Sequence, residues 1–278
     1  LHLIPQWPIG AAIAELIEAM TVRLAREGLT LVVHAHSREA RPVGDLWKAI
    51  TPAAVINDQV LDEREQAAAR RAGIPVIAPV YTVGSGSFAD FQREIGRRQA
   101  EHLAALGHRR LGYAMPDDDR LTLFSLPRLE GVREVCDRLG LDEPLVRTVP
   151  LDPNAGVEAG AQAQAEAAAG STAARAVADW NRAEPRITAV CAYNDEVALA
   201  VLVGMRAHGL SAPEDLAVIG ADDIPSAALA YPPLSTLSIG MSALGDTLAQ
   251  AVVNVLAGAP EPSGPGPDAI RIVRRSTT

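Results

Sequence analysis

Aromatic residues and cysteines are scarce in this sequence of 278 residues. Aromatic side chains make up only 4% of the chain, so a core has to be built from Ala, Val, Leu and Ile. The two cysteines, Cys136 and Cys191, each lie within an apolar stretch. Such positions favour buried free thiols over a disulfide, and they indicate a reducing, cytoplasmic compartment.

Positive charge is also in short supply. The formal net charge is -9, with 25 Lys and Arg against 34 Asp and Glu. A surface with this balance repels phosphate groups, so we predict that the chain by itself binds neither DNA nor an anionic membrane. No apolar run approaches the length of a membrane span, and no signal peptide is visible. Because the chain starts without Met, inside the apolar stretch 1–4, we expect its native N-terminus to lie further upstream.

What the sequence does contain is a regular alternation of strand and helix patterns. Hydrophobic residues make up 48% of the chain, which is enough for a large core, and a chain of this length tends to divide into two lobes. Both halves of the chain show the same pattern, which predicts α/β lobes with parallel sheets covered by helices on both faces. Apolar runs predict strands at 1–4, 29–34, 53–56, 75–78, 110–115, 145–148, 189–193, 216–220, 235–239 and 270–273. Helical spacing predicts helices from about 13 to 28, between the third and fourth strands, from the 83–87 loop to 106, and at 129–139, 156–181, 195–208 and 244–258.

Polar side chains follow many of these predicted strands. In parallel sheets, ligands bind at the carboxyl ends of the strands, so residues directly after a strand are candidate ligand contacts. Loop residues are polar in any fold, so the pattern alone does not identify a ligand. The residues at these positions are Gln6, Trp7, His34, His36, Asn57, Asp58, Tyr81, Asp117, Asn194, Asp195, Asp222 and Asp223.

Patterns typical of metal, phosphate and catalytic sites are incomplete. His34 and His36 share one face of a strand, but no further ligand completes a metal site. The Gly-Ser loop at 84–87 lacks the third glycine and the Lys of a phosphate-binding loop. We find no paired nucleophile and base. The sequence therefore predicts no enzyme, no metal and no cofactor.

Several segments, taken in order, resemble the sensing domain of lactose-repressor (LacI/GalR) transcription regulators, which has the type I periplasmic-binding-protein fold. The resemblance spans essentially the whole chain and is densest from Leu106 onward. The segments are Leu106-Gly107-His108-Arg109-Arg110-Leu111-Gly112-Tyr113, Pro127-Arg128-Leu129-Glu130-Gly131, Ala192-Tyr193-Asn194-Asp195-Glu196-Val197-Ala198, Asp215-Leu216-Ala217-Val218-Ile219-Gly220-Ala221-Asp222-Asp223-Ile224-Pro225, Pro232-Pro233-Leu234-Ser235-Thr236-Leu237 and Val273-Arg274-Arg275-Ser276-Thr277.

The resemblance implies three effector contacts in the second lobe. Arg128 offers a planar fork of donors suited to vicinal hydroxyls or a carboxylate. Asn194 offers a donor and an acceptor, and Asp222 accepts the hydrogen bonds of a diol. Each has a purely structural alternative. Arg128 could be a solvated residue at a helix start, Asn194 could cap the following helix, and Asp222 or Asp223 could belong to an Asx turn.

The first lobe departs from the family pattern, and here the candidates are more apolar. Trp7 can stack on a sugar or a planar ring, or it can pack without touching a ligand. Asn57 and Asp58 are the best polar candidates on this side. The remaining candidate contacts, which suggest a pocket with more apolar walls than a simple hexose site, are Gln6, Tyr81, Phe91, Phe124 and Met241.

These observations predict one architecture and two possible functions. The first lobe comprises 1–106 plus 237–267, and the second comprises 107–236 plus 268–278, with three crossovers between them. We expect a sugar or sugar derivative to bind between the lobes and to modulate DNA binding by an N-terminal helix-turn-helix head that this chain does not contain. The resemblance also implies a homodimer, to which the helix at 242–256 could contribute. The alternative is an extracytoplasmic solute-binding protein of a sugar transporter.

Overall fold

The computed structural model divides the chain into two compact units. The first comprises Leu1–Phe88 and Gly240–Gly266, and the second comprises Ala89–Ile239 and Pro267–Thr278. The chain therefore passes between the units three times. The structure describes residues 1–4, 8–34, 51–57, 63–77, 88–151, 171–259 and 269–278.

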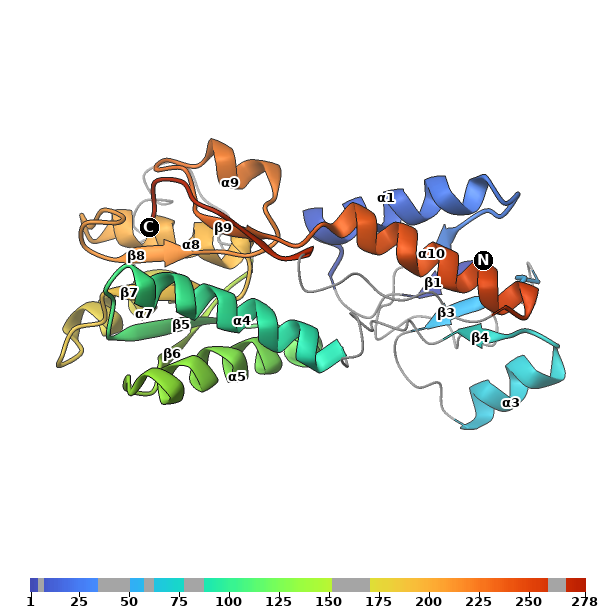
Figure 1. The fold of residues 1–278 in the computed structure, drawn as a ribbon, viewed down its shortest axis with the longest axis horizontal. Coiled ribbons are helices and arrows are strands. Elements are labelled where there is room, and N and C mark those ends of the chain that lie inside the picture. The colour runs from blue at the N-terminus through green and yellow to red at the C-terminus, as the bar shows by residue number, and fades with distance from the viewer. Residues whose placement is uncertain (5–7, 35–50, 58–62, 78–87, 152–170, 260–268) are drawn as a thin grey trace. The chain divides into compact units, whose positions relative to one another are not determined.

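The first unit is built on a parallel sheet in the order β2-β1-β3-β4 (Figure 1). Leu3 pairs with Val33 on one side and with Ile56 on the other, so β1 lies inside the sheet. The strands are β1 (His2–Ile4), β2 (Val32–Val33), β3 (Val55–Asn57) and β4 (Val76–Ile77), and the helices are α1 (Ala11–Ala25), α3 (Glu63–Arg71) and α10 (Met241–Ala257).

Helices α1 and α10 pack closely although they are far apart in the sequence. A Cβ atom at Gly245 would lie 2.5 Å from the carbonyl oxygen of Leu16, so only glycine allows this approach. Arg23 of α1 donates a hydrogen bond to Gln250 of α10. Apolar side chains at helical spacing, such as Leu16, Met20 and Leu24, are buried in this unit.

The second unit holds a parallel sheet in the order β6-β5-β7-β8 and a separate antiparallel pair, β10-β9. Its strands are β5 (Leu111–Pro116), β6 (Leu145–Val149), β7 (Ala189–Ala192), β8 (Ala217–Ile219), β9 (Thr236–Ser238) and β10 (Arg271–Val273). Its helices are α4 (Phe88–Ala105), the 3₁₀ turn η1 (Asp119–Leu121), α5 (Thr122–Leu139), α7 (Thr172–Arg182), α8 (Asp195–Ala207) and α9 (Pro225–Leu229).

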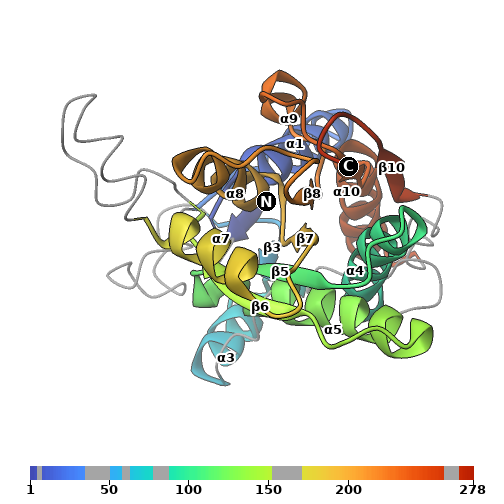
Figure 2. The same ribbon diagram turned by 90° about the vertical axis from the view of Figure 1, so that its left-hand side faces the viewer.

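Helices cover both faces of this second sheet (Figure 2). Leu111 and Tyr113 of β5 share a buried cluster with side chains of α4 and α5. Gly112 faces the other way, where a Cβ would lie 2.9 Å from the indole nitrogen of Trp180 in α7. That nitrogen donates a hydrogen bond to the Leu145 carbonyl. The period-two alternation along β5 therefore builds two apolar layers, as a doubly covered parallel sheet requires.

Helices α4 and α5 cross at two glycines. A Cβ at Gly96 would lie 1.8 Å from the carbonyl oxygen of Arg128, and a Cβ at Gly131 would lie 2.0 Å from that of Arg93. Such distances are impossible for any side chain, so the two backbones are in direct contact. This crossing places the second and third turns of α4 beside the second and third turns of α5.

Three sequence predictions need correction or fall outside the described residues. The boundary predicted at 106 is wrong, because α4 belongs to the second unit, where Leu103 packs into the core cluster. Helix α5 begins at Thr122 rather than 129, and it continues through Pro127. Residues 156–170 of the helix predicted at 156–181 lie outside the described residues; the described part is α7. Within the described ranges, no helix combines the length and the apolar character that crossing a membrane needs.

Candidate functional site

Arg128 is the centre of a buried polar cluster in the second unit. It lies in the second turn of α5, and its residue surface is only 5% exposed. Its Nε donates to Gln92 Oε1 at 2.7 Å, and its Nη1 donates to the Tyr193 carbonyl at 2.6 Å. The guanidinium also lies 4.7 Å from the centre of the Tyr193 ring, within the range of a cation–π contact. The alternative of a solvated helix-start residue is therefore wrong.

Asp222 faces the remaining side of this guanidinium. Its Oδ1 lies 3.8 Å from Arg128 Nη2, which is close enough for an ion pair and too long for a hydrogen bond. Burial raises the pKa of Asp222, and the positive charge of Arg128 opposes that rise. The residue has a φ of 103°, which an L-amino acid rarely adopts, and its backbone N–H donates to Leu237 O at 2.8 Å. The backbone thus holds Asp222 in an unusual conformation facing Arg128.

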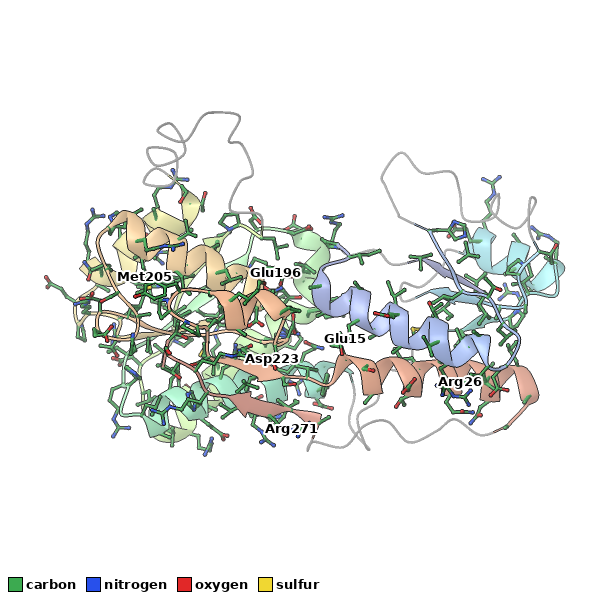
Figure 3. All side chains as sticks on the ribbon, turned by 90° about the horizontal axis from the view of Figure 1, so that it is seen from above. Glu15, Arg26, Glu196, Met205, Asp223 and Arg271 are labelled. Carbon is green, nitrogen blue, oxygen red and sulfur yellow. The ribbon has the colours of Figure 1, made fainter. Side chains whose placement is uncertain are left out.

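Asn194 caps helix α8, as one of the alternatives for this residue predicted. Its side-chain oxygen accepts the Val197 N–H at 3.0 Å, and its Nδ2 donates to Glu196 Oε2 at 2.5 Å. Glu196 is labelled in Figure 3. Because Asn194 directly follows Tyr193, whose carbonyl binds Arg128, its side chain belongs to the same end of the sheet.

Asp195 is a fully buried carboxyl group behind these residues. It accepts hydrogen bonds from Thr236 Oγ1 at 2.5 Å and from Ile224 N at 2.9 Å. Burial raises its pKa to about 8; the two hydrogen bonds oppose this rise, and the charge of Asp222 adds to it. A Cβ at Gly220 would lie 2.0 Å from Asp195 Oδ1, so that position requires glycine. Asp195 therefore ties α8 to the loop that carries Asp222 and to β9.

The predicted second-unit residues Arg128, Asn194 and Asp222 are thus brought together at the carboxyl ends of β7 and β8. Phe91 in α4 and Phe124 in α5 are buried residues of the same unit. Met241 is a buried residue at the start of α10 in the first unit. Asn57 ends β3, but its side chain, like the whole of Gln6, Trp7, Asp58 and Tyr81, lies outside the described residues.

Two buried glutamines of α4 belong to the cluster and were not predicted. Gln92 binds Arg128, as described above. Gln99 donates from Nε2 to the carbonyls of Ala192 at 2.8 Å and Gly220 at 2.9 Å, at the ends of two strands. A polar residue on an amphipathic helix is usually solvated, so the sequence held no signal for either. Asp195 was among the residues following a predicted strand, but nothing marked it as buried.

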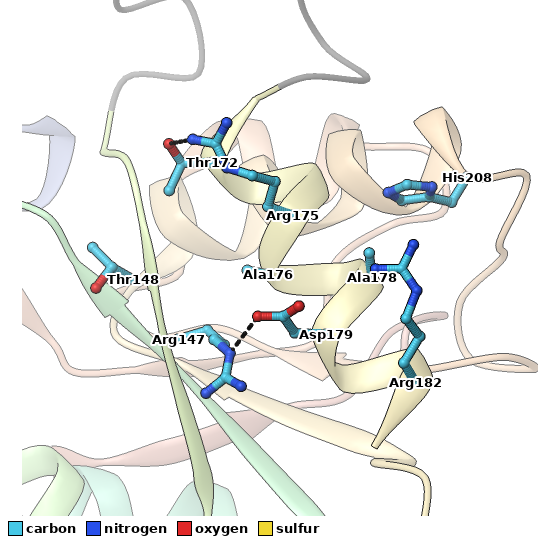
Figure 4. A pocket seen from close by; sticks show the side chains of 9 residues that line it. All are labelled: Arg147, Thr148, Thr172, Arg175, Ala176, Ala178, Asp179, Arg182 and His208. Carbon is cyan, nitrogen blue, oxygen red and sulfur yellow. Dashed lines mark hydrogen bonds and ion pairs between the residues drawn. The ribbon is translucent and has the colours of Figure 1, made fainter. Parts of the chain in front are cut away.

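A separate groove of about 570 Å³ lies on the other helical layer of the second unit (Figure 4). Two of its arginines have partners within the protein: Arg147 pairs with Asp179 at 2.7 Å, and Arg175 donates to Thr172 at 3.0 Å. None of the predicted site residues lines it. Among the residues that the structure describes, no cluster of His, Cys, Asp and Glu could hold a metal ion.

The chain is similar to a known domain family and to several curated proteins. Residues 100–278 match the family model of the periplasmic binding protein-like domain. The chain is 31% identical to the HTH-type transcriptional regulator MalR of Streptomyces coelicolor over 58% of this chain and 42% of the relative. It is 31% identical to the HTH-type transcriptional regulator CelR of Thermobifida fusca over 72% of this chain and 53% of the relative. The chain thus spans about half the length of these relatives.

Solved structures show the same fold. A LacI family transcriptional regulator from Enterococcus faecium with bound ribose superposes with a TM-score of 0.76 at 18% identity, covering 100% of this chain and 97% of that one. A dimeric Lac repressor superposes with a TM-score of 0.74 at 19% identity, covering 100% and 98%. The predicted fold class, two parallel-sheet lobes joined by three crossovers, is confirmed. The chain belongs to the family of periplasmic-binding-protein-like domains that lactose-repressor-type (LacI/GalR) transcription regulators carry.

Proposed function

We propose that this chain senses a sugar or sugar derivative through Arg128, Asn194 and Asp222 of the second unit. In the whole protein, binding would change the affinity for operator DNA of a helix-turn-helix head. We further propose that the protein works in the cytoplasm, where the buried free thiols Cys136 and Cys191 remain reduced.

The observation that carries this proposal is the distance between Arg128 and Asp222. Their facing atoms are 3.8 Å apart, and a hydroxyl oxygen about 2.8 Å from each would bridge them. Such a hydroxyl accepts a hydrogen bond from the guanidinium and donates one to the carboxylate. Both bonds are charge-assisted and therefore strong, and the surrounding burial strengthens them.

The ligands of related proteins support the same chemical class. The Enterococcus faecium regulator was solved with bound ribose, and a CelR structure is a cellobiose complex. Both molecules carry several hydroxyl groups, and neither carries a charge. The pair of Arg128 and Asp222 is suited to such a ligand, because a donor and an acceptor stand side by side.

Regulation would follow from differential binding. A sugar that binds one conformation of the protein more tightly shifts the population toward it by the difference in binding free energy. If the head binds operator DNA better in one of the two conformations, sugar binding changes the affinity for DNA, and DNA binding changes the affinity for the sugar by the same factor. The acidic chain itself, with a net charge of -9, leaves the DNA contacts to the head.

The test is a thermal-shift screen of pentoses, hexoses, disaccharides, sugar phosphates and nucleosides, followed by Arg128→Ala. A sugar at 100 times its Kd should stabilise the wild type by about 2.7 kcal/mol, or a rise in Tm of about 5–10 °C. Arg128→Ala should lose this rise. The control is Arg133→Ala on the same helix, which removes an exposed ion pair with Glu143 and should keep it.

Asp222→Asn adds a second arm, because it removes the charge while keeping the shape of the side chain. It should weaken binding of the same sugar. An unchanged rise in Tm in both Arg128→Ala and Asp222→Asn would overturn the site. Specific retardation of duplex DNA by this chain alone, at physiological salt, would overturn the assignment of DNA binding to the head.

We also propose that the chain forms a homodimer. The similarity to a dimeric Lac repressor supports it, as do Leu229 and Tyr231 at the end of α9, which are 85% and 86% exposed. Apolar side chains exposed next to one another mark interfaces, and these two lie two positions apart in the sequence. Sedimentation velocity should show a dimer for the wild type. The double variant Leu229→Asp and Tyr231→Asp should be a monomer. A wild-type monomer at micromolar concentration would contradict the proposal.

A further inference from the structure

The three nitrogen atoms of Arg128 face three different groups. Nε donates to Gln92, Nη1 donates to the Tyr193 carbonyl, and Nη2 faces Asp222 without a hydrogen bond. The first two contacts hold the guanidinium in one orientation. Asp222 therefore lies beside the positively charged Arg128 without a direct hydrogen bond to it. Because the site is buried, a direct hydrogen-bonded ion pair between the two would be favourable.

Gln92 lies on helix α4, whereas the other two groups that face Arg128, Tyr193 and Asp222, follow strands of the sheet. It is 3% exposed and lies on α4, one turn before Gly96, whose position leaves no room for a Cβ against the Arg128 carbonyl. The helix crossing therefore delivers the amide of Gln92 to the guanidinium of a residue 36 positions later in the chain.

We infer that Gln92 is a positioning residue of the effector site, which keeps Arg128 and Asp222 apart so that a ligand hydroxyl can bridge them. Without an acceptor at Gln92, the buried Nε–H would lose its partner. The nearest remedy is rotation of the guanidinium, so that Nε and Nη2 together bind the carboxylate of Asp222 in the two-bond geometry that arginine favours. In that direct pair, the Arg128 guanidinium and the Asp222 carboxylate would bind each other and could no longer bind a ligand hydroxyl.

The variant Gln92→Met tests this, since Met is similar in length and accepts no hydrogen bond from Nε of comparable strength. Gln92→Glu keeps an acceptor at the same place and should rescue the orientation. Arg93→Met is the matched control. Arg93 lies on the same helix at the same crossing and binds Asp90 and Glu130, but it does not bind Arg128. Its replacement removes partly exposed ion pairs and leaves the acceptor of Arg128 Nε in place.

The first measurement needs no ligand. Titration of the Asp222 carboxyl carbon by NMR, in protein labelled with ¹³C at Asp and assigned with Asp222→Asn, should give a lower pKa in Gln92→Met than in the wild type. A direct pair with Arg128 stabilises the ionised carboxylate, which lowers the pKa. The pKa should stay unchanged in Arg93→Met. An Asp222 pKa that does not fall in Gln92→Met overturns the inference.

The second measurement rests on the proposed function and uses ribose, cellobiose and the sugar with the largest effect in the thermal screen as probes. Gln92→Met should weaken binding at least tenfold, whereas Gln92→Glu and Arg93→Met should change it less than threefold. When Asp222→Asn is already present, Gln92→Met should reduce the affinity for the sugar much less than it does in the wild type, because no direct ion pair with Arg128 can form. Equal losses in the two backgrounds would assign Gln92 a merely structural role.

The two proposals fail in different ways. If no sugar binds the wild type, the proposed function fails, while the Asp222 titration still decides the role of Gln92. If a sugar binds and Arg128→Ala abolishes binding but Gln92→Met does not weaken it, the effector site stands and the inference about Gln92 is wrong.

Discussion

Replacing the buried Asp195 by Asn should keep its hydrogen bonds while removing its ability to ionise. Asp195 accepts hydrogen bonds from Thr236 and Ile224, and it is fully buried. Asn has the same shape. Its oxygen can accept the Ile224 N–H, and its amide can donate to the Thr236 hydroxyl in place of accepting from it. The substitution should therefore leave the fold intact and remove only the titration.

The size of the effect follows from the pKa of Asp195, which burial raises from 3.8 to about 8. Between these two values the folded state keeps a proton that the unfolded state has lost, so unfolding releases a proton and is favoured as the pH rises. The stability that this group contributes is complete below pH 3.8 and is lost progressively up to about pH 8. Each pH unit costs about 1.4 kcal/mol, or about 4 kcal/mol between pH 5 and pH 8.

The assay is urea unfolding of both proteins at half-unit steps from pH 5 to pH 9, followed by circular dichroism. The difference in unfolding free energy, Asp195→Asn minus wild type, should rise by up to about 4 kcal/mol between pH 5 and pH 8 and then level off. Taking the difference removes the contributions of groups that titrate alike in both proteins, including Asp118 and Asp215, whose pKa values are lowered. A difference that stays constant across this range would refute a protonated Asp195 at neutral pH.

Two further predictions concern the elements that build the site. Gly96→Ala places a methyl group against the Arg128 carbonyl. It should lower the free energy of unfolding of the second unit by about 3 kcal/mol or more in urea, and it should abolish the rise in Tm caused by a sugar. A decrease of less than about 1 kcal/mol would contradict the direct contact between α4 and α5. Asn194→Ala should cost about 1 kcal/mol by removing the cap of α8 and should also weaken sugar binding, whereas Asn194→Asp should keep the cap and weaken binding alone. Equal stability of Asn194→Ala and the wild type would show that the cap contributes nothing.

Local sequence patterns were sufficient for most elements of the second unit. The predicted strands at 110–115, 145–148 and 189–193 agree with β5, β6 and β7 to within about one residue at each end. Buried strands of a parallel sheet are apolar on both faces, and this signal does not depend on distant parts of the chain. The same holds for Asn194, because an N-cap is a contact within one turn of its own helix.

Two errors arose where packing outweighs local preference. The helix was predicted at 129–139, next to the segment 127–131 that resembles a helix start of the family. The helix nevertheless begins at Thr122, with Phe124 and Ser125 buried and the Ser125 carbonyl accepting a hydrogen bond from Tyr113. Helix α4 was assigned to the first lobe because the segment at 106–113 resembles the family's junction into the second lobe. Its buried Leu103 belongs to the core cluster of the second unit, which the order of elements does not reveal.

The amino-acid sequence was enough to predict the fold class and the family, because periodicity and short motifs depend on neighbouring residues, and it proposed Arg128, Asn194 and Asp222 as candidate site residues. How these side chains are held is a property of the tertiary structure. Gln92 meets Arg128 because Gly96 and Gly131 let two helices touch, and Asp195 meets Thr236 across 41 positions of the chain. Such contacts depend on the three-dimensional path of the backbone, which no local pattern encodes. Buried polar groups must find partners wherever that path places them, and here those partners define the candidate site.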